Sequence, residues 1–130
     1  MRRLLLDTHV LLWLLVDPTK IRATTLSIVR DRQNELLISP ASAWEIATKH
    51  RLGRLGQAQT VINGYTSHLE TLGATELPIT GRDALTAGQM TWDHQDPFDR
   101  MLVAQAMIRS LVLVTKDDEI TNFGGVNVVW

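Results

Sequence analysis

The chain lacks cysteine altogether, and it also lacks a long apolar run and an excess of charge of either sign. Without cysteine it can form no disulfide bond, zinc ribbon, thiol nucleophile or iron–sulfur cluster, and we expect a reducing, cytoplasmic setting. The longest apolar run, residues 10–16, is much shorter than the roughly 18 residues that cross a bilayer, so we expect no membrane segment. The 13 Lys and Arg against 14 Asp and Glu give a net charge of −1, so charge alone does not indicate a nucleic-acid partner.

The length of 130 residues fits a single domain over residues 1–130, because domains average roughly 150 residues. Short apolar runs that predict strands alternate with longer segments of helical periodicity. We expect strands at 4–6, 36–38, 76–79, 111–114 and 126–130, and helices at 8–16, 23–32, 41–52, 58–72, 82–90 and 98–109. Strands separated by helices predict a three-layer α/β sandwich with a central parallel sheet.

Acidic residues gather where the expected strands lead into helices. Asp7 follows the first strand and Asp117 follows the fourth, and ligands of open parallel sheets bind at the carboxyl ends of the strands. Asp96 and Asp99 open the helix at 98–109. Each Asp alone could be an ordinary helix cap. Glu45 differs, because it lies in a segment almost without other charges, and a buried glutamate is rare unless it is paired or bound to metal.

Carboxylates that converge at one edge of a sheet repel one another and need a cation. Oxygen ligands suit Mg²⁺ or Mn²⁺, and such ions activate water for attack on a phosphodiester. The acids therefore predict metal-assisted hydrolysis.

Four segments carry the acids and their neighbours: LLLDTHVLLW at 4–13, SPASAWEI at 39–46, HQDPFDR at 94–100 and LVTKD at 113–117. Together they resemble VapC-type toxins of the PIN-domain family. The resemblance implies a parallel sheet of strand order 3-2-1-4-5 and a magnesium-dependent endoribonuclease, the toxin of a toxin–antitoxin pair, with Mn²⁺ as a possible alternative ion. It also implies RNA as the substrate, a VapB-type antitoxin as the partner and a homodimer. The apolar helices after Asp7 and Ser39 are candidates for the contacts with these partners or, alternatively, part of the core.

The resemblance also assigns the site. Its catalytic and metal-holding acids are Asp7, Glu45, Asp99 and Asp117, and its supporting residues are Thr8, Asp96, Thr115 and Asp118. Asp117 stands at the family's offset from Thr115 and is favoured as the ligand over Asp118, which is expected to cap the turn that follows. Basic residues beside the acids are candidates for RNA contacts or, equally, for solvated helix ends: Arg100, Lys116, Lys49 and Arg51.

The histidines and tryptophans give weaker indications of function. The four histidines lack the spacing of a zinc site, and we expect a loop or capping role for His94. Trp13 and Trp44 lie on apolar helix faces and are expected in the core. A ribonuclease that uses paired histidines would leave the acids unexplained.

Other classes of protein share acids at strand ends. A phosphoacceptor signalling domain would need an aspartate after its middle strand, and residues 76–80 supply none. A haloacid-dehalogenase-type phosphatase would need a second aspartate at the position of His9. A catalytically silent binding module with the PIN fold stays open as an alternative.

Overall fold

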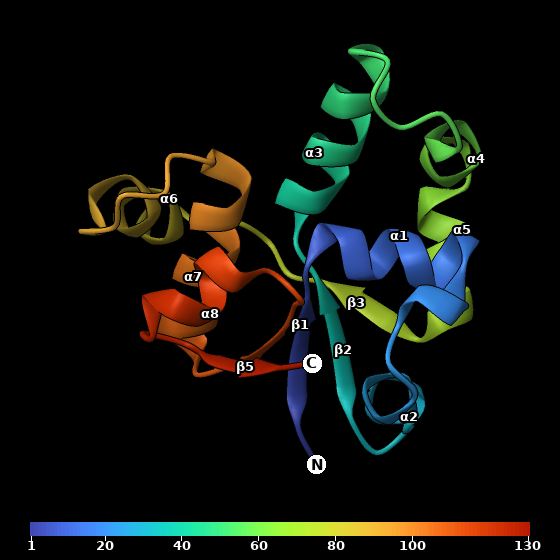
Figure 1. Ribbon diagram of the computed structural model, residues 1–130, viewed down its shortest axis with the longest axis horizontal. Helices are drawn as coiled ribbons and strands as arrows, with labels where there is room; N and C mark the ends of the chain where they lie inside the picture. The colour runs from blue at the N-terminus through green and yellow to red at the C-terminus, as the bar shows by residue number, and fades with distance from the viewer.

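Five parallel strands form one sheet in a computed structural model that describes residues 1–130 (Figure 1). The strands are β1 Arg3–Leu6, β2 Glu35–Ile38, β3 Ala74–Glu76, β4 Val112–Val114 and β5 Asn127–Val129, and their order is β3-β2-β1-β4-β5. In the central strand, Leu5 pairs with Leu37 of β2 on one side and with Leu113 of β4 on the other. The expected strand order, 3-2-1-4-5, is confirmed.

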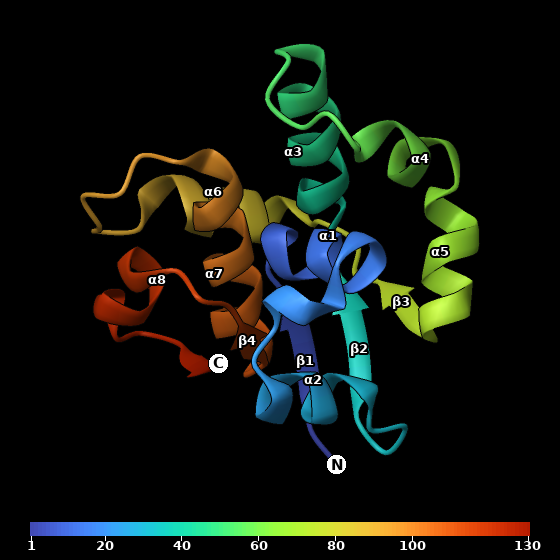
Figure 2. The same ribbon diagram turned by 45° about the vertical axis from the view of Figure 1, so that its right-hand side comes forward.

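Helices cover both faces of the sheet. They are α1 Thr8–Val16, α2 Ala23–Arg30, α3 Pro40–Arg51, α4 Ala58–Asn63, α5 Tyr65–Leu72, α6 Gly81–Gln89, α7 Pro97–Arg109 and α8 Asp118–Phe123, with a 3-10 turn, η1, at Pro18–Lys20. Leu4 and Leu6 of β1 face a core shared with α1 to α5, whereas Leu5 faces a core shared with α7 and α8. Figure 2 shows α1 and α2 crossing in front of β1 and β2, with α7 and α8 to the left of these strands. The chain is therefore the three-layer α/β sandwich that the pattern predicts.

The helices that carry candidate site residues begin at well-formed caps. The Ser39 hydroxyl accepts from the Ala41 N–H at 3.1 Å, and Pro40 fills the first position of α3. Asp96 caps α7 in the same way, with Pro97 next. These caps fix where α3 and α7 start, directly above the sheet edge.

Three local predictions are wrong. The helix expected over 58–72 divides at Gly64 into α4 and α5. The strand expected over 76–79 lies at Ala74–Glu76 instead, because Pro78 has no N–H to give to a ladder. A short helix, α8, occupies residues where only a turn was expected.

Trp44 also departs from expectation. It is 63% exposed rather than part of the core, and its ring meets the Phe98 ring edge-on at 4.9 Å between centroids. Trp13 is half-buried and packs against Trp130 at 5.9 Å. None of the helices has both the length and the apolar character that crossing a membrane would require.

Candidate active site

The first pair of acids lies where two adjacent strands end. Asp7 follows β1, its backbone N–H donates to the carbonyl oxygen of Val114 at 3.0 Å, and its side chain is buried. The Thr115 hydroxyl donates to Asp7 Oδ2 at 2.6 Å and accepts from the Asp117 N–H at 3.0 Å. One buried hydroxyl thus links the Asp7 side chain to the Asp117 backbone, so Thr115 lies beside both acids.

Glu45 reaches the same edge from α3 and is only 2% exposed. One of its oxygens, Oε2, forms an ion pair with the ammonium group of Lys49, one turn along the helix. The other, Oε1, is buried and has no hydrogen-bond partner. A buried carboxylate oxygen without a hydrogen-bond donor is costly, and a bound cation would satisfy it. The Thr8 hydroxyl donates to the Ser42 hydroxyl oxygen at 2.9 Å. This bond joins α1 to α3 and does not involve the carboxylates.

Asp99 comes from the first turn of α7. Asp96 Oδ1 accepts from the N–H groups of Phe98 at 2.9 Å and of Asp99 at 3.1 Å, so Asp96 fixes the turn that carries Asp99. Asp99 Oδ2 lies 2.7 Å from His94 Nε2. One ligand atom from each of His94, Asp99 and Asp117 lies within 4.8 Å of the others. His94 lies in the loop before α7, as expected, and its ring in addition contacts Asp99.

Burial and mutual repulsion shift the pKa values of several ionisable groups in the site. Burial, with the charge of Glu45, raises the pKa of Asp7 even though Thr115 opposes the shift. Burial, together with the charges of Asp96, Asp7 and Glu45, raises the pKa of Asp99 to about 7, although His94 opposes it. The hydrogen bond to Asp99 raises the pKa of His94. For Lys49, burial alone lowers the pKa, but the bond to Glu45 outweighs it and the net shift is upward.

These observations fit a bound divalent cation. Crowded carboxylates with raised pKa values favour a positive charge among them, and Glu45 Oε1 is a buried oxygen with no hydrogen-bond partner. The carboxylates of Asp7, Glu45, Asp99 and Asp117 would offer oxygen atoms, the ligands that hard cations prefer.

The surroundings of Asp117 and Asp118 bear on which of the two is the candidate metal ligand. Asp117 lies with His94 and Asp99, whereas Asp118 is exposed as the first residue of α8. The capping role expected of Asp118 belongs to Asp117, whose Oδ1 accepts from the Glu119 N–H at 2.9 Å.

The basic residues have different environments. All five N–H donors of Arg100 point to backbone carbonyl oxygens, those of Ala87, Gly88, Met90, Trp92 and His94. No donor is left for a phosphate, so the expectation of an RNA contact at Arg100 is wrong. Lys49 is paired with Glu45, and Arg51 and Lys116 are exposed.

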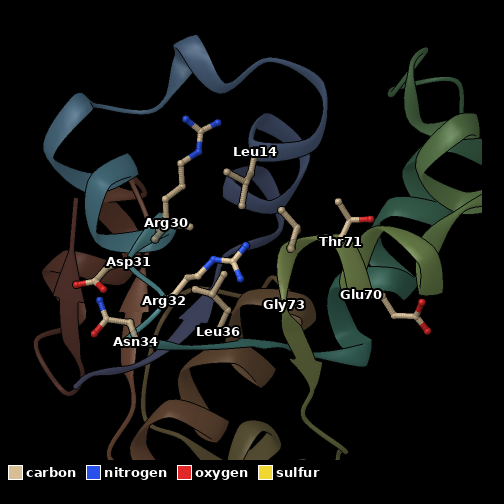
Figure 3. A pocket seen from close by; sticks show the side chains of 11 residues that line it. Leu14, Arg30, Asp31, Arg32, Asn34, Leu36, Glu70, Thr71 and Gly73 are labelled. Atoms are coloured by element: carbon tan, nitrogen blue, oxygen red, sulfur yellow. The ribbon is translucent and has the colours of Figure 1, made fainter.

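A cavity of about 540 Å³ lies away from these acids (Figure 3). It opens between the end of α2, the start of β2 and the end of α5, and Arg30, Arg32 and Leu36 are among its lining residues. None of the converging acids lines it, so the candidate active site is the acid cluster and not this hollow.

Comparison with known proteins assigns the family. The PIN domain family matches residues 4–126 of the chain. The chain belongs to the PIN-domain family. Ribonuclease VapC16 of Mycobacterium tuberculosis is 36% identical to this PIN domain over 55 residues, a segment that spans 42% of this chain and 39% of that protein.

Solved structures share the PIN fold at low sequence identity. VapBC2 from Rickettsia felis, bound to a DNA fragment from its promoter, aligns with a TM-score of 0.67 at 11% identity and covers 98% of this chain and 97% of that one. VapBC-1 from nontypeable Haemophilus influenzae aligns with a TM-score of 0.65 at 18% identity, over 98% and 96% of the two chains.

Two features of this PIN domain escaped the sequence reasoning. His94 belongs to the acid cluster, and its position at the head of the HQDPFDR segment was the signal that could have placed it there. The pairing of Lys49 with Glu45 follows from their spacing of four residues on one helix, which brings side chains together.

Proposed function

We propose that this PIN domain is a metal-dependent endoribonuclease, the toxin component of a VapBC-type toxin–antitoxin pair, and that it acts in the cytoplasm on RNA phosphodiesters. The observation that carries the proposal is the buried, unpartnered Oε1 of Glu45, whose carboxylate charge acts on both Asp7 and Asp99. The partial match to a protein named as a ribonuclease supports the same activity.

In this proposal Asp7, Glu45, Asp99 and Asp117 hold Mg²⁺, with Mn²⁺ as the alternative. A bound divalent cation lowers the pKa of water and stabilises charge on a phosphoryl oxygen. The chain's own residues orient the acids: Thr115 fixes Asp7, and Asp96 fixes the turn that carries Asp99. Lys49 neutralises Glu45 when no cation is present. Arg51 and Lys116, both exposed, are the proposed contacts to the RNA backbone.

Cleavage assays test this activity. We expect wild-type protein to cleave single-stranded or looped RNA with Mg²⁺ or Mn²⁺ and to stop when EDTA is added. Asp7→Asn and Asp99→Asn should abolish cleavage, whereas Asp118→Asn is the matched control because that acid is exposed and outside the cluster. Cleavage that survives EDTA and both substitutions would exclude the metal mechanism. Tight binding of a partner by a protein that neither binds metal nor cleaves RNA would favour the silent binding module.

A VapB-type antitoxin and a second copy of the chain are the proposed protein partners. The antitoxin proposal is supported by the VapBC names of the structural neighbours. A groove of about 450 Å³ beside α1, lined by Leu12, Trp13 and Val16, offers apolar surface to a helix of such a partner. Co-expression with the product of an adjacent small gene, followed by size-exclusion chromatography, tests both: Val16→Glu should weaken the complex and leave the fold intact.

A further inference from the structure

One group in the acid cluster is not an oxygen ligand. The imidazole of His94 places Nε2 2.7 Å from Asp99 Oδ2, and both residues share the 4.8 Å cluster with Asp117. Ligand atoms bind a divalent ion of this class at about 2.0–2.2 Å, so atoms on opposite sides of one ion lie about 4 Å apart. The three residues therefore need only small side-chain rotations to contact a single ion.

Contacts with Arg100 and Trp92 hold His94 in place. An Nη1 N–H of Arg100 donates to the His94 carbonyl oxygen at 3.0 Å, as part of the set of five bonds that fastens residues 87–94 to α7. The imidazole packs against Trp92 at 4.9 Å between ring centroids, and Trp92 packs in turn on Phe123 of α8 at 4.8 Å. The loop thus holds His94 between two helices. The first turn of α7 carries Asp99, and α8 directly follows Asp117.

We propose that His94 is a direct nitrogen ligand of the metal held by Asp99 and Asp117, and that the site therefore prefers Mn²⁺ and Co²⁺ to Mg²⁺. Mg²⁺ binds oxygen ligands, whereas imidazole binds transition metals well, and a nitrogen ligand raises their affinity relative to Mg²⁺. The inference rests on the proposed metal site but not on cleavage of RNA.

A positioning role is the rival explanation, in which His94 only orients Asp99 through the 2.7 Å hydrogen bond. Substitution by glutamine separates the two roles. A glutamine side chain keeps an N–H that can donate to Asp99 but offers no ring nitrogen to a metal. A nitrogen ligand predicts a loss of affinity that is selective for Mn²⁺ and Co²⁺, whereas a positioning role predicts equal effects on all ions.

The experiment uses the full chain as wild type, His94→Gln and, as a matched control, His68→Gln on α5. Mn²⁺ affinity is measured from the electron paramagnetic resonance signal of free Mn²⁺, Mg²⁺ affinity by calorimetry, and direct nitrogen coordination by electron spin echo modulation of bound Mn²⁺. We expect nitrogen modulation in the wild type and in His68→Gln and none in His94→Gln. Mn²⁺ affinity should fall about tenfold or more in His94→Gln, which is the size of effect seen when groups in a metal site are removed. Mg²⁺ affinity should change less than about twofold.

The proposal is overturned if tightly bound Mn²⁺ shows no nitrogen coupling in the wild type, or if His94→Gln lowers Mn²⁺ and Mg²⁺ affinity equally. A wild-type protein that binds neither ion removes this inference and the metal mechanism together. Nitrogen-coupled Mn²⁺ in a protein that cleaves no RNA would support the ligand role of His94 while the proposed ribonuclease activity fails. Circular dichroism of His94→Gln checks that the fold is retained.

Discussion

Thr115 donates its hydroxyl hydrogen to Asp7 Oδ2 at 2.6 Å, across the ends of the adjacent strands β1 and β4. The Thr115 hydroxyl oxygen in turn accepts from the Asp117 N–H at 3.0 Å, so Thr115 contacts one acid from each strand end. Both strands are fully buried around this point, and the hydroxyl has no exposure to solvent. The geometry of the candidate metal site therefore depends on Thr115, a neutral side chain that orients the acids.

Thr115→Val tests this dependence. Valine has nearly the same shape but neither donates to Asp7 nor accepts from Asp117, so the acids lose their orientation. We expect Mg²⁺ affinity, measured by calorimetry, to fall about 10- to 100-fold, the range found when partners of metal ligands are removed. Thr115→Ser keeps the hydroxyl and should stay close to wild type. Equal affinities in Thr115→Val and wild type would show that Thr115 does not position the site.

Asp117 and Asp118 form a natural pair for comparison. Asp117→Asn should lower metal affinity, because Asp117 lies within the cluster with His94 and Asp99. Asp118→Asn should bind metal as the wild type does, because its side chain is exposed. Asparagine still caps a helix well, so α8 is retained in the Asp117 variant. If the Asp118 variant alone lost affinity, the choice of ligand would have to be reversed.

Lys49 should stabilise the metal-free protein. Lys49→Met leaves Glu45 buried with neither carboxylate oxygen paired, and we expect the free energy of unfolding to fall by about 2–3 kcal/mol. Added Mg²⁺ takes over the role of the lysine, so the rise in Tm on adding Mg²⁺ should be larger in Lys49→Met than in the wild type. Thermal unfolding with and without Mg²⁺ measures both effects. Arg51→Met on the same helix is the control, and equal Mg²⁺ shifts in both variants would contradict the role given to Lys49.

Stability at low pH should depend on Asp83. Burial by itself raises the pKa of this carboxyl, but the two bonds from Arg109, at 2.8 and 3.0 Å, and the Thr80 N–H outweigh it and lower the pKa below its usual value. A lowered pKa in the folded state means that the stabilisation is complete above the unfolded value, about 4, and is lost as pH falls through the folded value.

Urea unfolding from pH 7 down to pH 2 tests this sign. Asp83→Asn should lower the free energy of unfolding at pH 7 by about 3 kcal/mol, because Arg109 loses its charge partner, and should flatten the loss of stability in acid. Asp31→Asn, at an exposed position, should follow the wild-type profile. An unchanged acid profile in Asp83→Asn would contradict the assignment.

The layered fold and the positions of the four acids were accessible from the sequence for physical reasons. Glu45 stood out as a charge in an otherwise apolar segment, and it is buried. Leu4, Leu5 and Leu6 are all fully buried, as a continuous apolar run in a parallel sheet must be. Asp7 and Asp117 follow strands that are neighbours, and strand ends of a parallel sheet share one edge. Asp99 follows a strong cap signal at Asp96-Pro97. The strand order itself came from the family resemblance and not from the pattern of apolar residues.

What the sequence missed depends on contacts between segments far apart in the chain. Helical periodicity placed Trp44 on an apolar face, but α3 projects from the body of the molecule beside α7, and the ring remains exposed against Phe98 (Figure 1). Helix α8 buries only Ile120, so it has no apolar period to detect. Arg100 looked like a free cation because nothing local shows that five carbonyl groups surround it.

The cation-binding role of the acids is tested most directly by titrating Mg²⁺ and Mn²⁺ into the metal-free wild-type protein and into Asp7→Asn, Asp99→Asn and Asp118→Asn, with the heat of binding as the signal. We predict saturable binding by the wild type and by Asp118→Asn, and at least tenfold weaker binding by Asp7→Asn and Asp99→Asn. Wild-type protein that binds neither ion, or variants at Asp7 and Asp99 that bind both ions as tightly as the wild type, would contradict it.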